Sequence, residues 1–188
     1  MAKVKAVKKK WIPVFASKEF NNVEIGEIPC EEPSKLIGKV IRANLYNLTN
    51  DARRQGSEVA FKIIKADDKK AETEAVNFKI LSAHLKRTVK KEKEKIDDSF
   101  ECETKDKVKM IVKPLMITKN RTNNSNLTNL RMQTRKKISE YAKNIEYEKF
   151  LKEVTQNSIQ RGMKNELKKV YPLIIFEIRE VAKVNAKK

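Results

Sequence analysis

Residues 97–114 read DDSFECETKDKVKMIVKP. Apolar and β-branched residues flank a polar centre, and this pattern predicts a β-hairpin. A two-residue turn would place charged side chains opposite apolar ones. A three-residue loop instead places Phe100 opposite Val112 and Cys102 opposite Met110, so that each face of the hairpin carries one kind of side chain. The side-chain chemistry therefore favours the three-residue loop.

The three-residue loop covers residues 105–107 and also pairs Glu103 with Lys109 on the charged face. Its last residue, Lys107, is expected in the left-handed backbone conformation that glycine adopts more easily. This local mismatch is the weak point of the predicted hairpin.

Strand-like segments lie on both sides of the hairpin. β-Branched and alternating apolar residues predict strands at 37–46, 58–64, 72–79 and 173–181, with weaker candidates at 11–17 and 23–28. No internal repeat is evident, and no Pro/Gly-rich linker divides the chain.

Three segments carry helical periodicity. Leu81, Leu85 and Val89 recur every four residues and predict a short amphipathic helix. A second helix covers 127–145, with Leu130, Ile138, Tyr141 and Ile145 predicted to face the sheet. A third covers 147–170, with a bend expected at Gly162 and a stop at Tyr171-Pro172.

The order of these elements predicts an α+β fold. We expect a mainly antiparallel, barrel-like sheet of about six or seven strands with helices packed at one side. The predicted organisation is a basic N-terminal tail over residues 1–10, one α+β domain over 11–182, and a basic C-terminal tail over 183–188.

The charge balance points to a polyanionic partner. The 188-residue chain carries 43 Lys+Arg against 25 Asp+Glu, a formal net charge of +18. Like charges repel in the compact state, and an anionic partner relieves that repulsion. The excess is concentrated in residues 1–10, 86–95 and 107–139, and the last zone has nine bases and no acid.

Structured RNA fits this distribution better than a single strand, because only 6% of the residues are aromatic and stacking modules need exposed rings. Arginines can also grip phosphates with two parallel bonds. The candidate RNA-binding residues are Lys3, Lys5, Lys8, Lys9, Lys10, Arg53, Arg54, Lys86, Arg87, Lys90, Lys91, Lys119, Arg121, Arg131, Arg135, Lys136 and Lys137.

Within the helix at 127–145, no acid lies in the turns that precede its cluster of bases. Arg131, Arg135, Lys136 and Lys137 are therefore expected to be free for RNA, and their joint removal is expected to leave the fold intact. Residues 1–10 and 119–126 lack a periodic apolar face, so both are expected to be irregular in the free protein.

Catalytic and metal-binding patterns are scarce. His84 is the single histidine, and the two cysteines, Cys30 and Cys102, are far apart, which excludes a zinc finger and a disulfide framework. No glycine-rich phosphate loop is present. We expect no catalytic residue, no metal, no cofactor and no small-molecule substrate. The alternative hypothesis is a metal-dependent nuclease that uses Asp97, Asp98, Glu101 and Glu103.

No segment has the roughly 18 apolar residues of a membrane span, and the basic start lacks a secretory core, so a cytosolic location without membrane contact is expected.

Several short motifs resemble one known family. Residues 9–41 read KKWIPVFASKEFNNVEIGEIPCEEPSKLIGKVI, and they are followed in order by LTND at 48–51, IDD at 96–98, TKD at 104–106, VKP at 112–114, YPL at 171–173 and EIR at 177–179. This ordered set resembles the archaeal and eukaryotic small-subunit ribosomal protein family S-one-e, formerly S-three-a-e. The resemblance covers nearly the whole chain.

The resemblance implies a structural protein of the small-subunit platform, near the messenger-RNA exit, with no enzymatic activity. Its implied partners are small-subunit ribosomal RNA, neighbouring ribosomal proteins and, at the exit, messenger RNA. The chain departs from the family at Lys107, where glycine is usual, and at residues 88–95, where arginine-rich runs are usual. The length favours an archaeal member.

Overall fold

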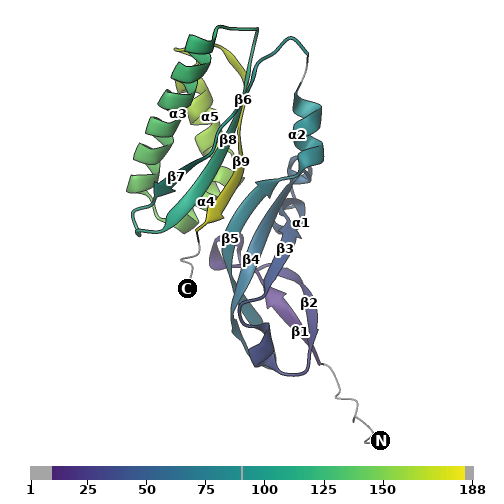
Figure 1. The fold of residues 1–188 in the computed structure, drawn as a ribbon. Coiled ribbons are helices and arrows are strands. Elements are labelled where there is room, and N and C mark those ends of the chain that lie inside the picture. The colour runs from purple at the N-terminus through teal and green to yellow at the C-terminus, as the bar shows by residue number, and fades with distance from the viewer. Residues whose placement is uncertain (1–9, 90, 185–188) are drawn as a thin grey trace, which may run out of the picture. The chain divides into compact units, whose positions relative to one another are not determined.

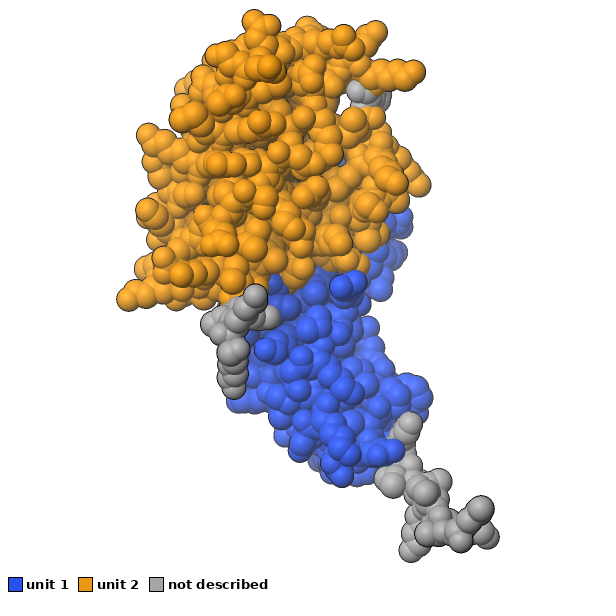
Figure 2. Space-filling model, viewed as in Figure 1, with its two compact units in different colours: residues 1–55, 59–76 blue, residues 56–58, 77–188 orange. Residues whose placement is uncertain are grey.

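The computed structural model describes residues 10–89 and 91–184, which form two compact units (Figure 2). Unit 1 is the described part of Met1–Gln55 together with Val59–Val76, and unit 2 is Gly56–Glu58 together with the described part of Asn77–Lys188. The predicted N-terminal tail lies outside the described residues except for Lys10, which begins a strand. The single domain over 11–182 stays a prediction.

Unit 1 contains most of the first five strands (Figure 1). Its elements are β1 (Lys10–Phe15), η1 (Lys18–Phe20), β2 (Glu24–Cys30), η2 (Pro33–Leu36), β3 (Val40–Asn44), α1 (Leu45–Thr49), η3 (Ala52–Arg54), β4 (Ser57–Ala66) and the first part of β5 (Ala71–Ile80). β1 pairs antiparallel with β2 and parallel with β5. A buried cluster fills the space between them: Ile12, Val14, Cys30, Leu36, Ile63 and Ala71.

The predicted strands at 58–64 and 72–79 are confirmed as β4 and β5. The prediction for 37–46 is wrong at both ends: β3 begins only at Val40, and α1 begins at Leu45. Asn44 causes the change at the C-terminal end, because its side-chain oxygen accepts a hydrogen bond from the Tyr46 N–H and caps the helix.

Unit 2 is a layer of strands with helices α3, α4 and α5 on one face (Figure 1). Its elements are the end of β5, α2 (Ser82–Thr88), β6 (Lys95–Asp97), β7 (Phe100–Glu103), β8 (Lys109–Thr118), α3 (Asn124–Asn144), α4 (Tyr147–Thr155), α5 (Ser158–Leu167) and β9 (Leu173–Lys183). β8 pairs with β9 along one edge and with β6 and β7 along the other. β8 is therefore the central strand of this unit.

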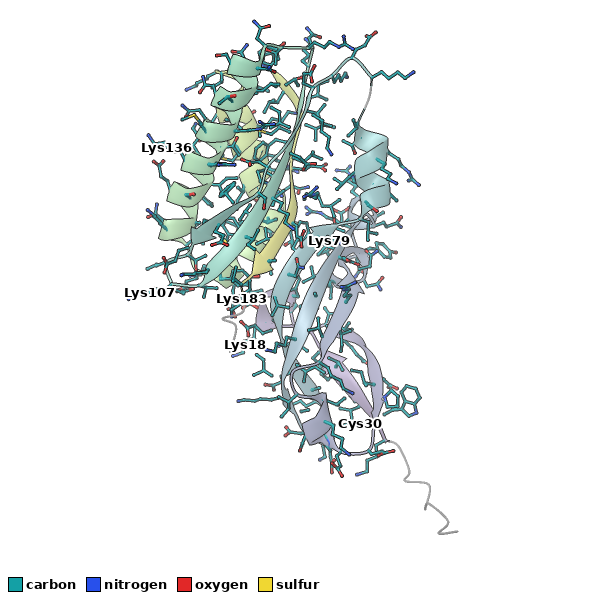
Figure 3. The ribbon with its side chains drawn as sticks, in the orientation of Figure 1. Lys18, Cys30, Lys79, Lys107, Lys136 and Lys183 are labelled. Atoms are coloured by element: carbon teal, nitrogen blue, oxygen red, sulfur yellow. The ribbon has the colours of Figure 1, made fainter. Side chains whose placement is uncertain are left out.

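The hairpin of β7 and β8 has the predicted register. Phe100 lies opposite Val112 and Cys102 opposite Met110. Lys107 has a φ of 59°, the left-handed conformation expected of it, and its N–H donates to the Thr104 carbonyl at 2.9 Å. Figure 3 shows Lys107 at the tip of the hairpin.

The predicted inward face of helix α3 is confirmed in part, because Leu130 and Ile138 are buried as predicted. Its buried residues are Leu130, Thr134, Ile138 and Ala142, a row with a spacing of four. Tyr141 is exposed, so the prediction that it faces the sheet is wrong. The Thr134 hydroxyl is satisfied in the interior, because it donates to the Met116 sulfur of β8 at 3.3 Å.

The third predicted helix is divided into α4 and α5 at Gln156 and Asn157, not at Gly162. Asn157 adopts a left-handed conformation with a φ of 59°, and this ends the first helical run. The final strand, predicted at 173–181, is confirmed as β9.

The α+β class is confirmed, but the barrel-like sheet is not. The described residues form nine strands, and the longest path of paired strands runs β2-β1-β5-β9-β8-β6 without closing on itself. The β1–β5 pair is parallel, whereas the pairs β1–β2, β5–β9, β6–β8, β7–β8 and β8–β9 are antiparallel. None of the helices in the described residues has the length and apolar content needed to cross a membrane.

Candidate nucleic-acid interface

The candidate bases lie on several separate elements. Lys10 is in β1 and Arg53 and Arg54 are in η3, all in unit 1. In unit 2 the candidates are Lys86 and Arg87 in α2, Lys91 after it, Lys119 and Arg121 before α3, and Arg131, Arg135, Lys136 and Lys137 in α3. Lys3, Lys5, Lys8, Lys9 and Lys90 lie outside the described residues.

Four of these bases form ion pairs within the protein. Lys10 contacts Asp68 at 3.5 Å and Arg54 contacts Asp51 at 3.4 Å. Arg135 binds Asp98, and Lys137 binds Glu166 of α5. The expectation that the bases of α3 have no acid to pair with is therefore wrong for two of the four, because the partners come from elements remote in sequence.

The contact between Asp98 and Arg135 joins α3 to the turn between β6 and β7. Arg135 Nε donates to one carboxylate oxygen at 2.6 Å, and its Nη2 donates to the other at 2.5 Å. The same carboxylate accepts the Ser99 N–H at 2.9 Å. The guanidinium holds the pKa of Asp98 below its usual range, and Arg131 adds to this effect through its charge.

Asp97 also has basic partners. It contacts Lys95 at 2.6 Å and Arg179 of β9 at 3.2 Å. Glu101 and Glu103 project to solvent from β7. The described residues contain no group of three or more His, Cys, Asp or Glu side chains placed to hold a metal ion. Asp97 and Asp98 are thus accounted for as parts of structural ion pairs rather than as metal ligands.

The other candidates in unit 2 have no acidic partner among the ion pairs of the described residues. They are Lys86, Arg87, Lys91, Lys119, Arg121, Arg131 and Lys136, and all are exposed. Figure 3 shows Lys136 projecting outward from α3, away from the strands. Their ammonium and guanidinium groups are free to meet an anionic ligand.

The segment 119–126 is more ordered than expected. Asn124–Asn126 belong to the first turn of α3. The Lys119 N–H donates to the Pro172 carbonyl at 3.0 Å, and the Tyr171 hydroxyl donates to the Arg121 carbonyl at 3.2 Å. The segment is therefore tied to the residues that precede β9.

Two bases that sequence reasoning missed lie just before the residues that make these hydrogen bonds. Lys168 and Lys169 follow α5, are exposed, and lie close in sequence to Tyr171. Glu166 lies two residues before this pair in the sequence and lowers the local excess of positive charge. The useful signal was the sequence KKVYP, in which two lysines immediately precede a helix stop.

Both cysteines behave as ordinary core residues. Cys30 and Cys102 are free and buried. Burial raises the pKa of the Cys102 thiol to about 11, so the reactive thiolate is disfavoured at neutral pH.

The class of protein follows from comparison with known sequences. A family model described as the Ribosomal S3Ae family matches residues 2–187, and the chain belongs to that family. It is accordingly a structural ribosomal protein of the small subunit, which works in the cytoplasmic ribosome and is not an enzyme.

Particular relatives are archaeal proteins named small ribosomal subunit protein eS1. The chain is 31% identical to that of Nanoarchaeum equitans over 173 residues, which cover 92% of this chain and 87% of the relative. It is 28% identical to those of Archaeoglobus fulgidus and Methanopyrus kandleri, with 92% of this chain and 83% of each relative covered. The nuclease hypothesis is set aside, because the family has a structural role.

Proposed function

We propose that this protein binds small-subunit ribosomal RNA at the platform, near the messenger-RNA exit, through the exposed bases of unit 2. The family and the net charge of +18 both support an RNA partner. Phosphate contacts by Lys and Arg would supply most of the affinity and hold the protein in a fixed register on the folded RNA.

One observation carries this proposal. In α3, Arg135 and Lys137 form ion pairs with acids of other segments, Asp98 and Glu166. Arg131 and Lys136 are exposed and form no ion pair among the described residues. Seven candidate bases of unit 2 share this condition. An RNA surface would supply the missing anions.

The same proposal includes neighbouring ribosomal proteins and, at the exit, messenger RNA as partners. Two exposed apolar side chains support a protein contact: Trp11 in β1 is 64% exposed and Met132 in α3 is 65% exposed. Large apolar side chains of this kind are enriched in the centres of protein interfaces.

Titration of the protein with archaeal small-subunit ribosomal RNA at several salt concentrations tests the proposal. If about six to ten phosphates are neutralised, affinity should fall on the order of a thousandfold or more between 50 and 200 mM salt. An affinity that hardly changes over this range would contradict it. Sedimentation of an archaeal lysate should also place the protein with the small subunit at low salt.

A further inference from the structure

Three segments that are far apart in the sequence meet at the end of unit 2 where β8 ends, the upper end in Figure 1. Thr118, the last residue of β8, is fully buried. Its N–H donates to the Glu94 carbonyl at 3.1 Å, and its hydroxyl oxygen accepts the Glu94 N–H at 3.0 Å. The backbone before β6 is thereby fixed beside the end of β8.

The segment that follows β8 is joined to the segment that precedes β9 by hydrogen bonds of Pro172 and Tyr171. The Thr118 hydroxyl donates to the Asn120 carbonyl at 2.7 Å, which sets the course of the chain after β8. The Lys119 N–H donates to the Pro172 carbonyl, and the Tyr171 hydroxyl donates to the Arg121 carbonyl. Segments 91–94, 119–121 and 168–172 are therefore held together by the fold, and we call them the three-segment surface.

The three-segment surface is strongly basic. It contains the bases Lys91, Lys93, Lys119, Arg121, Lys168 and Lys169 and the acids Glu92 and Glu94. Lys93 is half-buried and the other five bases are exposed. Among the ion pairs of the described residues, none involves any of these six bases. The hydrogen bonds that join the segments are made by the backbone and by the hydroxyls of Thr118 and Tyr171, not by acidic side chains.

We propose that the three-segment surface is a preorganised site for the phosphates of folded RNA, and that Lys168 and Lys169 are contact residues in it. This inference rests on the proposed function and specifies where one of its contacts lies. Because each segment is tied to a neighbour at Glu94, at Lys119 and Arg121, or at Tyr171 and Pro172, binding has less backbone to order. Thr118 and Tyr171 act as positioning residues.

The apolar side chains favour RNA over a protein as the occupant. The large apolar residues that are exposed in the described chain all lie outside segments 91–94, 119–121 and 168–172. Protein interfaces are depleted in lysine and have an apolar centre, whereas contacts with nucleic acid are made largely by bases to phosphate oxygens.

The direct test compares two double variants of the full chain. Lys168→Ala with Lys169→Ala removes two bases from the three-segment surface. The matched control, Lys143→Ala with Lys152→Ala, removes two exposed lysines from the C-terminal end of α3 and from α4. The probe is archaeal small-subunit ribosomal RNA transcribed in vitro, titrated at salt concentrations from 50 to 300 mM.

Each phosphate contact contributes about 0.7 to 0.9 to the slope of log affinity against log salt, or about 5- to 8-fold in affinity at 0.1 M salt relative to 1 M. Loss of two contacts should therefore weaken binding about 25- to 60-fold and reduce the slope by about 1.4 to 1.8. The control should change affinity less than about threefold, because screening at 0.1 M salt limits long-range attraction to about 10 Å.

A second variant tests the positioning role without changing any charge. Tyr171→Phe removes the hydroxyl that holds the Arg121 carbonyl. We expect weaker binding, by about 5-fold or more, and a reduced salt slope, with a thermal midpoint close to that of the unchanged protein. A purely structural role for Tyr171 would lower the midpoint and leave the salt slope unchanged.

The possible failures are distinguishable. If the unchanged protein binds RNA with the expected salt dependence but the Lys168/Lys169 variant matches the control, the three-segment surface is refuted and the proposed function stands. If the unchanged protein shows no salt-dependent binding to the RNA, the three-segment surface and the proposed function are both refuted. Loss of a neighbouring ribosomal protein from assembled subunits, with RNA affinity unchanged, would show that a protein covers this surface and would also refute the proposal.

Discussion

The bond between Asp98 and Arg135 should stabilise the fold, and a double-mutant cycle measures by how much. The three variants are Asp98→Asn, Arg135→Met and their combination. The two N–H donors bind the carboxylate at 2.5 and 2.6 Å, a geometry typical of strong charge-assisted bonds. Such bonds are worth about 1.5 to 3 kcal/mol when they are shielded from water.

The exposure of Arg135 to water lowers the free energy expected for this bond. The Asp98 side chain is only 7% exposed, but the Arg135 side chain is 52% exposed. Arg135 itself covers the carboxylate, so its removal readmits water and limits the penalty. We therefore expect a coupling free energy of about 1 to 2 kcal/mol, above the roughly 0 to 1 kcal/mol of an ordinary surface pair.

The assay is urea unfolding at neutral pH, with the free energy of unfolding obtained for each member of the cycle. Lys136→Ala with Lys143→Ala is the control, because these exposed lysines of α3 have no ion pair in the described residues; its unfolding free energy should change by less than about 0.5 kcal/mol. A coupling below about 0.3 kcal/mol would refute the reasoning. So would unchanged stability of a variant lacking Arg131, Arg135, Lys136 and Lys137 together.

The same bond fixes the sign of a pH effect. The pKa of Asp98 is lower in the folded protein than in the unfolded chain, because Arg135 favours its charged form. The folded state therefore binds fewer protons in this range, and stability rises with pH. The contribution of Asp98 should be complete above the unfolded value of about 3.9 and lost as the pH falls through the lower folded value. Arg135→Met should flatten this part of the stability curve; an unchanged slope would contradict the assignment.

Three further results are expected from unfolding measurements. Lys107→Gly should stabilise the protein by about 0.5 to 1 kcal/mol, because glycine relieves the left-handed backbone of the hairpin loop; a lower urea midpoint would count against this. Gly56→Ala should destabilise by about 1 to 3 kcal/mol, since the new Cβ would lie 2.8 Å from His84 Cγ. Adding His84→Ala should restore part of the loss, because the ring is removed while the His84 Cβ remains 3.0 Å away. If residues 11–182 form one domain, Trp11 fluorescence and far-ultraviolet circular dichroism should report a single coincident transition, whereas two separate midpoints would show independent units.

The hairpin shows what could be predicted from sequence. The pairs Phe100 with Val112 and Cys102 with Met110 follow from local alternation of apolar and charged side chains, and one residue of slippage would exchange the faces. The strands β4, β5 and β9 were predicted for the same reason. Local signals failed where a single side chain redirected the backbone, as Asn44 does at the start of α1 and Asn157 between α4 and α5.

The face of α3 required the tertiary structure. Helical periodicity alone allowed both Tyr141 and Ala142 to face inward. In the folded protein the row of Leu130, Thr134, Ile138 and Ala142 faces the strands, and the Tyr141 hydroxyl instead donates to Glu153 of α4 at the surface. The Met116 sulfur makes Thr134 acceptable in the interior, and no sequence pattern shows that partner.

The α+β class, the excess of positive charge and the family resemblance follow from the amino-acid sequence alone, because composition, alternation and short motifs are local properties. The sequence also singled out some of the bases that are exposed, such as Arg121, Arg131 and Lys136. The pairing of these bases depended on tertiary structure: Arg135 meets an acid 37 residues away and Lys137 one 29 residues away. Thr118 and Tyr171 likewise join segments that no local pattern relates. Contacts between distant segments depend on how strands and helices pack, so the sequence does not show which charges are neutralised inside the protein and which remain free for the proposed RNA partner.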